Sequence, residues 1–176
     1  AIARVQTRSA FEAKGDVVIG NLTSNGGKIS VTGRTLNLAG NINSGTGETT
    51  IGSNNNIFLG GSALSGCGVG FASLCDMSIV QAELDKISAS KLTIGGTLTG
   101  DITVDGVTLT SFSDGVVLDV DTHVSGSDGA LIFKADSSFS SLEAKAVNGI
   151  NVNANITTTT GALSLNGDAD SGVDSI

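Results

Sequence analysis

Apolar side chains alternate with polar ones in short runs along most of this 176-residue chain. Side chains in a β-strand point alternately to opposite faces, so such a period of two predicts strands that bury one face. Gly, Asn, Ser or Asp separates one run from the next, which is typical of tight turns. We therefore expect an all-β fold with many short strands. The clearest runs are residues 28–32, 35–39, 56–59, 101–104 and 116–120.

A repeat becomes visible when four segments are superposed on a glycine, namely Gly27, Gly47, Gly129 and Gly161. Each glycine has apolar or threonine side chains two and four places later. Gly27 and Gly47 lie 20 residues apart, and Gly149 follows Gly129 at the same interval. A period near 20 residues built of short strands predicts a β-solenoid, in which each strand stacks on its counterpart in the next coil. Residues 1–176 are expected to form one such segment of a longer protein.

The composition fits a narrow coil, because the chain has 25 Gly and no Pro, Trp or Tyr, and only 3% of its residues are aromatic. Proline would interrupt a backbone ladder, whereas glycine permits the positive φ angles of sharp corners. Val, Ile, Leu and Ala would fill an interior too narrow for large rings. Phe58, Phe133 and Phe139 fall on or beside predicted strands, and we expect them to plug that interior, while Phe71 lies in a glycine-rich loop.

Residues 66–90 interrupt the repeat, and they begin with that loop between Cys67 and Cys75. The two cysteines could close a local disulfide, which would imply an oxidising, extracellular location, or they could be two unrelated buried thiols. Their spacing differs from the CxxC of a zinc or redox site.

A short helix is predicted near residues 76–88, directly after the cysteine loop. Val80, Leu84 and Ile87 would share one helical face, and we expect that face to lie against the solenoid wall. Asp76 or Ser78 could cap the start of this helix, and Ser78 with Gln81 has the spacing of a capping box.

The charge of the chain disfavours nucleic acid as a partner. The formal net charge is −8, from 17 acidic and 9 basic residues without a long single-sign run, whereas nucleic-acid binding needs clustered Lys and Arg. No apolar run approaches the roughly 18 to 20 residues of a membrane span, so we expect none in this segment.

No catalytic centre is expected. His123 is the only histidine and has no nucleophile motif near it, so an outward polar role is favoured. Acidic groupings of the kind that polysaccharide lyases and hydrolases use would be Asp101, Asp105, Asp119 and Asp121, or Glu143 beside Lys145. Asp119 and Asp121 would share one strand face, and a solvated acidic surface is the favoured interpretation.

Two further kinds of site follow from short motifs. Asp168, Asp170 and Asp174 alternate with small residues and could provide calcium ligands, although an acidic turn is favoured because the bidentate Glu of an EF-hand is missing. No other cofactor is expected. Asn21 and Asn155 begin N-glycosylation sequons, which matter only in a eukaryotic source.

Two stretches resemble a known family. Residues 79–96 with 100–104, and residues 138–142, 148–152 and 158–170, are similar to repeats of giant filamentous-haemagglutinin-like surface proteins, over about half the chain. The resemblance implies a right-handed parallel β-helix in a long secreted or cell-surface protein. Its implied role is a non-enzymatic filament or adhesin segment. We expect a stiff rod built by coil stacking, whose terminal coils could assemble end to end into a fibre. Its partners would be other copies, neighbouring segments, or host or surface glycans. The alternative is a carbohydrate-binding or polysaccharide-cleaving β-helix.

Overall fold

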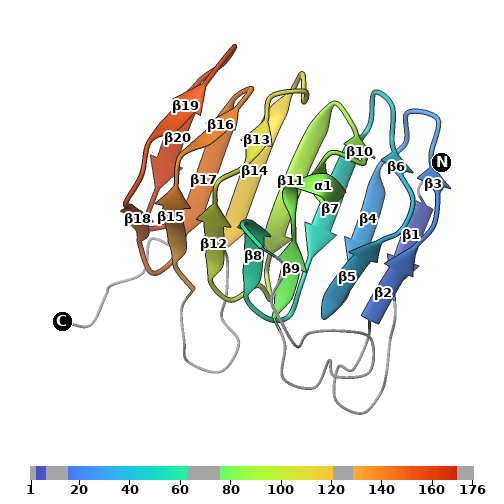
Figure 1. Ribbon diagram of the computed structural model, residues 1–176, viewed down its shortest axis with the longest axis horizontal. Coiled ribbons are helices and arrows are strands. Elements are labelled where there is room, and N and C mark those ends of the chain that lie inside the picture. The colour runs from blue at the N-terminus through green and yellow to red at the C-terminus, as the bar shows by residue number, and fades with distance from the viewer. Residues whose placement is uncertain (1–2, 7–15, 63–75, 121–128, 170–176) are drawn as a thin grey trace.

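The computed structural model describes residues 3–6, 16–62, 76–120 and 129–169 (Figure 1). Within these residues the fold is all-β apart from one short helix, and every paired strand runs parallel to its neighbour. The strands follow one another along the longest axis, from the N-terminal ones at one end to the C-terminal ones at the other (Figure 1). Within the long sheet, the strands at the two ends of the chain, β1 and β20, therefore lie at opposite ends of the stack.

The strands belong to several sheets, the largest of which we call the long sheet. In spatial order it contains β1 (Ala3–Gln6), β4 (Ile29–Thr32), β7 (Glu48–Gly52), β11 (Lys91–Gly96), β14 (Gly115–Val120), β17 (Leu142–Ala146) and β20 (Leu163–Asn166). A five-stranded sheet contains β18 (Ile150–Val152), β15 (Leu131–Ala135), β12 (Ile102–Asp105), β8 (Ile57–Gly60) and β9 (Met77–Ile79). A two-stranded sheet pairs β2 (Asp16–Ile19) with β5 (Thr35–Leu38).

Two three-stranded sheets complete the fold. One contains β10 (Ile87–Ser88), β6 (Ile42–Asn43) and β3 (Leu22–Thr23), and the other β13 (Thr108–Leu109), β16 (Ser137–Phe139) and β19 (Ile156–Thr158). The chain visits the sheets in turn: after β4 come β5 and β6, and β7 then returns to the long sheet beside β4. We call one such pass a rung. This arrangement is consistent with a parallel β-helix, and the five alternating runs correspond to β4, β5, β8, β12 and β14.

Buried side chains form columns that cross the long sheet from strand to strand. Val31, Ile51, Ile94, Leu118 and Ala144 are aligned by the parallel register, and each has no exposed surface. Fully burying one aliphatic side chain contributes about 1.5 to 3 kcal/mol. Each rung therefore gains its stability mainly by packing on the rungs beside it.

Two of the three phenylalanines that were predicted to fill the interior lie there. Phe133 and Phe139 have no exposed surface, and their rings meet edge to face with centroids 6.4 Å apart, which confirms the prediction for these two. The prediction for Phe58 is wrong, because Phe58 is partly exposed while its neighbours Ile57 and Leu59 are fully buried. Since alternate residues of a strand face opposite ways, Phe58 points outward.

The four glycines that were superposed to show the repeat do not all precede strands of one sheet. Gly27, Gly47 and Gly161 precede strands β4, β7 and β20 of the long sheet, but Gly129 precedes β15 of the five-stranded sheet. Rung length also varies more than the predicted period. Ile29 aligns with Thr49, 20 residues later, whereas Thr49 aligns with Leu92, 43 residues later.

The 43-residue interval between Thr49 and Leu92 contains the predicted insertion. The prediction of a helix near residues 76–88 is mostly wrong. The helix α1 spans only Gln81–Leu84, and the residues predicted to start and end it form strands β9 and β10 instead. Val80 is the N-cap, and its backbone N–H donates to Oε2 of Glu83 at 3.2 Å. Ser78 lies within β9 and makes no capping bond; its Oγ is buried without a partner.

Strand β9 is part of the sheet rather than a decoration of its outer surface. It pairs with β8 on the edge opposite β12 and contacts β5 without pairing to it (Figure 1). Side chains from α1 and its C-terminal flank form hydrogen bonds with the backbone of Leu38, the last residue of β5. Oε1 of Glu83 accepts from the N–H of Leu38 at 3.2 Å, and Nζ of Lys86 donates to the Leu38 carbonyl. The insertion is thereby tied into the stack.

Candidate functional site

Charged and hydroxyl side chains gather on the outer face of the long sheet. Because the strands are parallel and in register, outward residues of neighbouring strands lie side by side. One outward row aligns Thr50, Thr93, Val117, Glu143 and Ser164, from β7 to β20. This row and the charged residues beside it form the candidate functional surface.

A hydrogen-bonded cluster occupies the β4–β7–β11 part of this surface. Nζ of Lys28 lies 3.0 Å from Oε2 of Glu48, and Oγ1 of Thr93 donates to Oε1 of Glu48 at 2.7 Å. Partial burial would raise the pKa of Glu48. The hydrogen bonds from Thr93 and Lys28, with the charges of Lys28 and Lys91, outweigh that effect and lower the pKa. Glu48 is therefore held as a carboxylate.

A second ion pair lies on β17, where Nζ of Lys145 is 2.7 Å from Oε1 of Glu143. This hydrogen bond lowers the pKa of Glu143 and raises the pKa of Lys145. The side chains are 46% and 42% exposed, so solvent screens the pair and its contribution to folding is small. The sequence placed these residues side by side, and the structure joins them as an ion pair rather than as a free acid and base.

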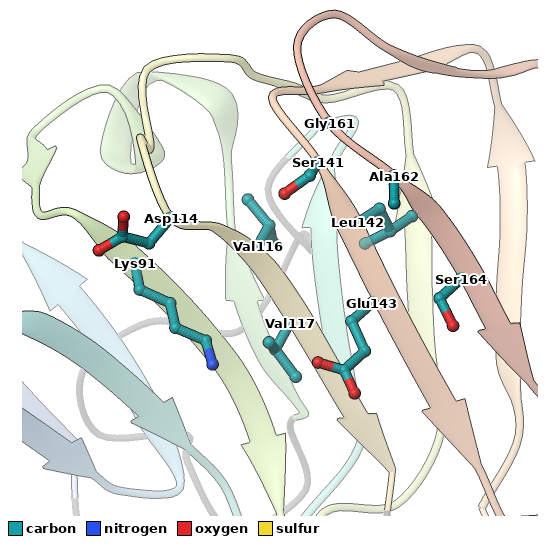
Figure 2. Close-up of a pocket in the computed structure, with 10 residues that line it drawn as sticks. All are labelled: Lys91, Asp114, Val116, Val117, Ser141, Leu142, Glu143, Gly161, Ala162 and Ser164. Atoms are coloured by element: carbon teal, nitrogen blue, oxygen red, sulfur yellow. The ribbon is translucent and has the colours of Figure 1, made fainter.

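A groove of about 310 Å³ crosses β11, β14, β17 and the start of β20 (Figure 2). Lys91 and Glu143 extend on either side of Val117, and Asp114 lies near the base of Lys91 (Figure 2). The charge of Lys91 acts on both Glu48 and Glu143. The groove thus offers a cation, carboxylates and a small apolar floor. Its full lining is Lys91, Asp114, Val116, Val117, Ser141, Leu142, Glu143, Gly161, Ala162 and Ser164.

A second depression of similar size, about 310 Å³, lies at the other end of the strands. It contains hydroxyl groups and backbone but no charged side chain; its lining is Thr32, Thr50, Gly52, Ser53, Asn54, Gly95, Gly96, Thr97, Leu98 and Thr99. Neither depression could be predicted from the amino-acid pattern, because each combines residues from at least three strands that lie far apart in the chain.

The described members of the acidic grouping considered from the sequence, Asp101, Asp105 and Asp119, are not brought together in one sheet. Asp101 directly precedes β12 and Asp105 ends it, in the five-stranded sheet, whereas Asp119 lies on β14 in the long sheet. Oδ1 of Asp101 accepts from the N–H of Ala130 at 2.8 Å, and Oδ2 of Asp105 pairs with Nζ of Lys134 at 2.8 Å. These two carboxylates tie neighbouring rungs to each other.

Both sequon asparagines are exposed and make the same kind of bond between rungs. Oδ1 of Asn21 accepts from the N–H of Asn41 at 3.0 Å. Asn155 donates to the Asp136 carboxylate from its backbone N–H and from Nδ2, at 2.9 and 3.2 Å, and these bonds lower the pKa of Asp136. This role was not predicted from the sequence, although Asn and Asp recur at turns about one rung apart.

Several predicted site residues lie outside the described residues: Cys67, Cys75, His123, Asp121, Asp170 and Asp174, together with Phe71. Asp168 is described and exposed, and its backbone N–H donates to Oδ1 of Asn166 at 3.1 Å. Across residues 3–6, 16–62, 76–120 and 129–169, no three His, Cys, Asp or Glu side chains come together in a way that could hold a metal ion. The disulfide and the calcium ligands remain predictions.

Within the same ranges, no helix has the length and apolar character needed to cross a membrane. No protein-family description, curated protein or solved structure matches the chain.

Proposed function

We propose that this chain is a segment of a right-handed parallel β-helix of the filamentous-haemagglutinin-like kind. In this proposal it serves a long, extracellular or cell-surface protein as a stiff, non-enzymatic rod that presents an adhesive surface. The single observation that carries the proposal is the column of buried side chains that crosses the long sheet from Val31 to Ala144 in unbroken parallel register. Such columns extend by adding rungs, so length and stiffness follow from the architecture itself.

The outward charges support a structural role for the outer faces of the long sheet and of the five-stranded sheet. Lys28 with Glu48, Lys134 with Asp105, and Lys145 with Glu143 are paired, and the pairs are spread over several strands. Spread and paired charges keep an exposed sheet face soluble and shield it from edge-to-face association. They also leave a mixed polar surface of the kind that contacts a neighbouring segment or a surface glycan.

Deleting one rung tests the architecture. Ile29 aligns with Thr49, so deletion of residues 29–48 should bring Thr49 into the place of Ile29 and leave the other columns in register. We expect this variant to keep its β-sheet circular dichroism and cooperative unfolding. Deletion of residues 29–38 is the control, because it removes part of a rung and should abolish folding. Loss of folding in both variants would contradict the stacked architecture.

Electron microscopy of the native source tests the biological role. Antibodies against this chain are expected to label rods or fibres outside the cell. Label confined to globular particles, or to the inside of the cell, would contradict an extracellular filament. Cell fractionation with the same antibody provides an independent measurement of location.

A second candidate function is carbohydrate binding or polysaccharide cleavage, and the groove between Lys91 and Glu143 favours it. Carboxylates with a neighbouring cation are the groups that such proteins direct at sugar hydroxyls and glycosidic bonds. Binding to a glycan array, or release of reducing ends from a polysaccharide, would support this function if Glu143→Gln abolished it. Lys28→Met changes a charge outside the groove lining and serves as the control.

A further inference from the structure

Three asparagines of this chain are followed directly by glycine: Asn25, Asn148 and Asn166. Asparagine is chemically labile, because the backbone nitrogen of the next residue can attack its side-chain amide carbon. Glycine in that next position favours the attack, since it has no Cβ to hinder the approach. The nitrogen must also lose its proton and turn toward the side chain, which a hydrogen bond from its N–H opposes. Hydrogen bonding of the glycine N–H therefore separates reactive pairs from protected ones.

The first pair, Asn25 with Gly26, is protected by the next rung. Both residues are exposed in the turn between β3 and β4, so solvent access alone would permit the reaction. The N–H of Gly26, however, donates to the carbonyl of Ser44 at 3.1 Å. Attack on Asn25 therefore first requires a hydrogen bond between two rungs to break.

The second pair, Asn148 with Gly149, lies between β17 and β18 and leaves its reacting nitrogen available. The N–H of Asn148 donates to the Gly129 carbonyl at 3.0 Å, and the Gly149 carbonyl accepts from the N–H of Leu131 at 3.1 Å. The N–H of Gly149 itself has no acceptor in the part of the chain that the structure describes. Asn148 is exposed, and Gly149 has a φ of +90° with open space where a Cβ would lie.

This nitrogen does not lie at an end of the described stack. Gly129 belongs to the preceding rung and Gly167 to the following one, and a Cβ on Gly167 would be only 3.3 Å from the Cα of Gly149. Rungs therefore pack on both sides of the pair, and neither places an acceptor at its N–H. Asn166 lies on the last described rung, so no assignment is made for it.

We propose that Asn148 is a site of spontaneous deamidation in the folded protein, whereas Asn25 is protected by its rung. The nitrogen of Gly149 forms a bond to Cγ of Asn148, the bond from Cγ to Nδ2 breaks, and Nδ2 leaves as ammonia with the proton of the Gly149 N–H. Water then opens the resulting succinimide ring at either carbonyl carbon, which leaves aspartate or isoaspartate. The reaction consumes one water and needs no oxidant. It depends on the geometry of the rungs and not on an adhesive or filament role.

The isoaspartate product would place an additional carbon atom in the main chain between two bonds that tie this rung to the preceding one. Those bonds connect Asn148 with Gly129 and Gly149 with Leu131, directly before β18 pairs with β15. Lengthening the backbone between them shifts one bond out of register. Isomerisation at Asn148 should therefore loosen β18 from β15.

Peptide mapping by mass spectrometry after incubation at mildly alkaline pH tests the proposal. The chain unfolded in urea provides the reference rate for each asparagine, because there no rung protects the glycine N–H. We expect folding to slow the reaction at Asn25 at least about fivefold more than at Asn148, since only Gly26 must first give up a hydrogen bond. Equal slowing at the two asparagines, or faster loss of the amide at Asn25, would overturn the proposal.

Asn148→Gln tests the consequence for the rung, because glutamine would have to close a larger ring and reacts far more slowly. After the same incubation, wild-type protein that contains isoaspartate should unfold at a lower urea concentration than Asn148→Gln, whereas the fresh proteins should unfold alike. Asn25→Gln is the control and should lose stability on incubation as the wild type does. Equal midpoints for incubated wild type and Asn148→Gln would overturn the loosening of β18.

Discussion

The side-chain amide of Gln81 binds both backbone groups of Thr108. Oε1 of Gln81 accepts from the N–H of Thr108 at 2.9 Å, and Nε2 of Gln81 donates to the Thr108 carbonyl at 3.0 Å. Strands β10 and β13 belong to separate sheets and do not pair with each other. At Thr108, the Gln81 side chain therefore makes the two hydrogen bonds that a peptide group of a neighbouring strand would make. On the other side of the helix, Glu83 and Lys86 bind the two backbone groups of Leu38. One helical turn therefore joins strands of the rungs before and after it.

Replacing Gln81 by Ala should weaken this connection. Three hydrogen bonds are lost, two to Thr108 and one from Nε2 of Gln81 to Oδ1 of Asp85 at 2.7 Å. Each has a net contribution of about 0.5 to 1.5 kcal/mol, and exposure keeps the total toward the low end. We expect the free energy of unfolding to fall by about 1 to 2 kcal/mol, as measured by urea denaturation. Asp85→Ala is the control, because it removes only the exposed hydrogen bond between Gln81 and Asp85 and leaves both bonds to Thr108; it should change the free energy of unfolding by less than about 0.5 kcal/mol. Equal effects would show that the bonds to Thr108 add nothing.

The paired phenylalanines provide a test of the interior. Phe133→Ala should leave a cavity beside Phe139 and lower the free energy of unfolding by about 3 to 5 kcal/mol. Phe58→Ala is the matched control, because Phe58 lies on the outer side of β8, where its removal leaves no closed cavity and should cost less than about half as much. Thermal and denaturant unfolding measure both values. A larger loss for Phe58 would contradict the outward orientation of its ring.

The sequence predicted the strands well because alternation has a direct physical meaning. Residues that face the interior are mostly apolar on successive rungs, and Val116, Leu118 and Val120 in β14 show this pattern. The pattern does not reveal which sheet a strand joins. Gly27 and Gly129 precede similar strands because both strands face the same interior, although one lies in the long sheet and the other in the five-stranded sheet.

The insertion and the outer surface were harder to predict, for two different reasons. Val80, Leu84 and Ile87 have helical spacing, yet the strand pairing of β9 with β8 and of β10 with β6 limits the helix to one turn. Tertiary pairing overrides such a local preference. The cluster of Glu48 with Thr93 could not be read from the chain, because it depends on β11 following β7 in the sheet after a long insertion.

Stability should depend on pH through Glu48. Its pKa is lowered in the folded protein, so its stabilisation is complete above the unfolded value of about 4.3 and is lost as the pH falls through the folded value. We expect the melting temperature to drop from about pH 5 downward, and Glu48→Gln to flatten part of that drop. Lys28→Met should flatten it less, since the hydrogen bond from Thr93 remains. An unchanged acid profile for Glu48→Gln would contradict the assignment.

Alkaline pH tests the second ion pair. The pKa of Lys145 is raised by its hydrogen bond to Glu143, so its contribution is complete below the unfolded value of about 10.4 and is lost as the pH rises through the folded value. The pair is exposed, so the change in melting temperature should be small. Lys145→Met should remove that change, whereas Lys134→Met, which breaks a pair on another sheet, should leave it in place.

The cysteine loop is tested most directly by mass spectrometry without reductant. If Cys67 and Cys75 are joined, the intact chain is lighter by two hydrogens than the reduced chain, and neither thiol reacts with iodoacetamide before reduction. Reduction should then lower stability by about 2 to 4 kcal/mol. A chain isolated under oxidising conditions with two alkylatable thiols would contradict the disulfide and remove its support for an extracellular location.

Gly95 is the position in the long sheet where a side chain should be least tolerated. Its φ is +104°, and an added Cβ would clash with the Asp119 carbonyl oxygen on the neighbouring strand β14, at 1.9 Å. Backbone strain of this kind costs about 1 to 3 kcal/mol, and the collision with β14 adds to it. Gly95→Ala should therefore destabilise the chain more than Gly96→Ala, which has a positive φ of +127° but free space around it. Gly20→Ala, with neither constraint, should be close to wild type in urea denaturation, and an equal loss in all three variants would show that neither φ nor the approach of β14 matters.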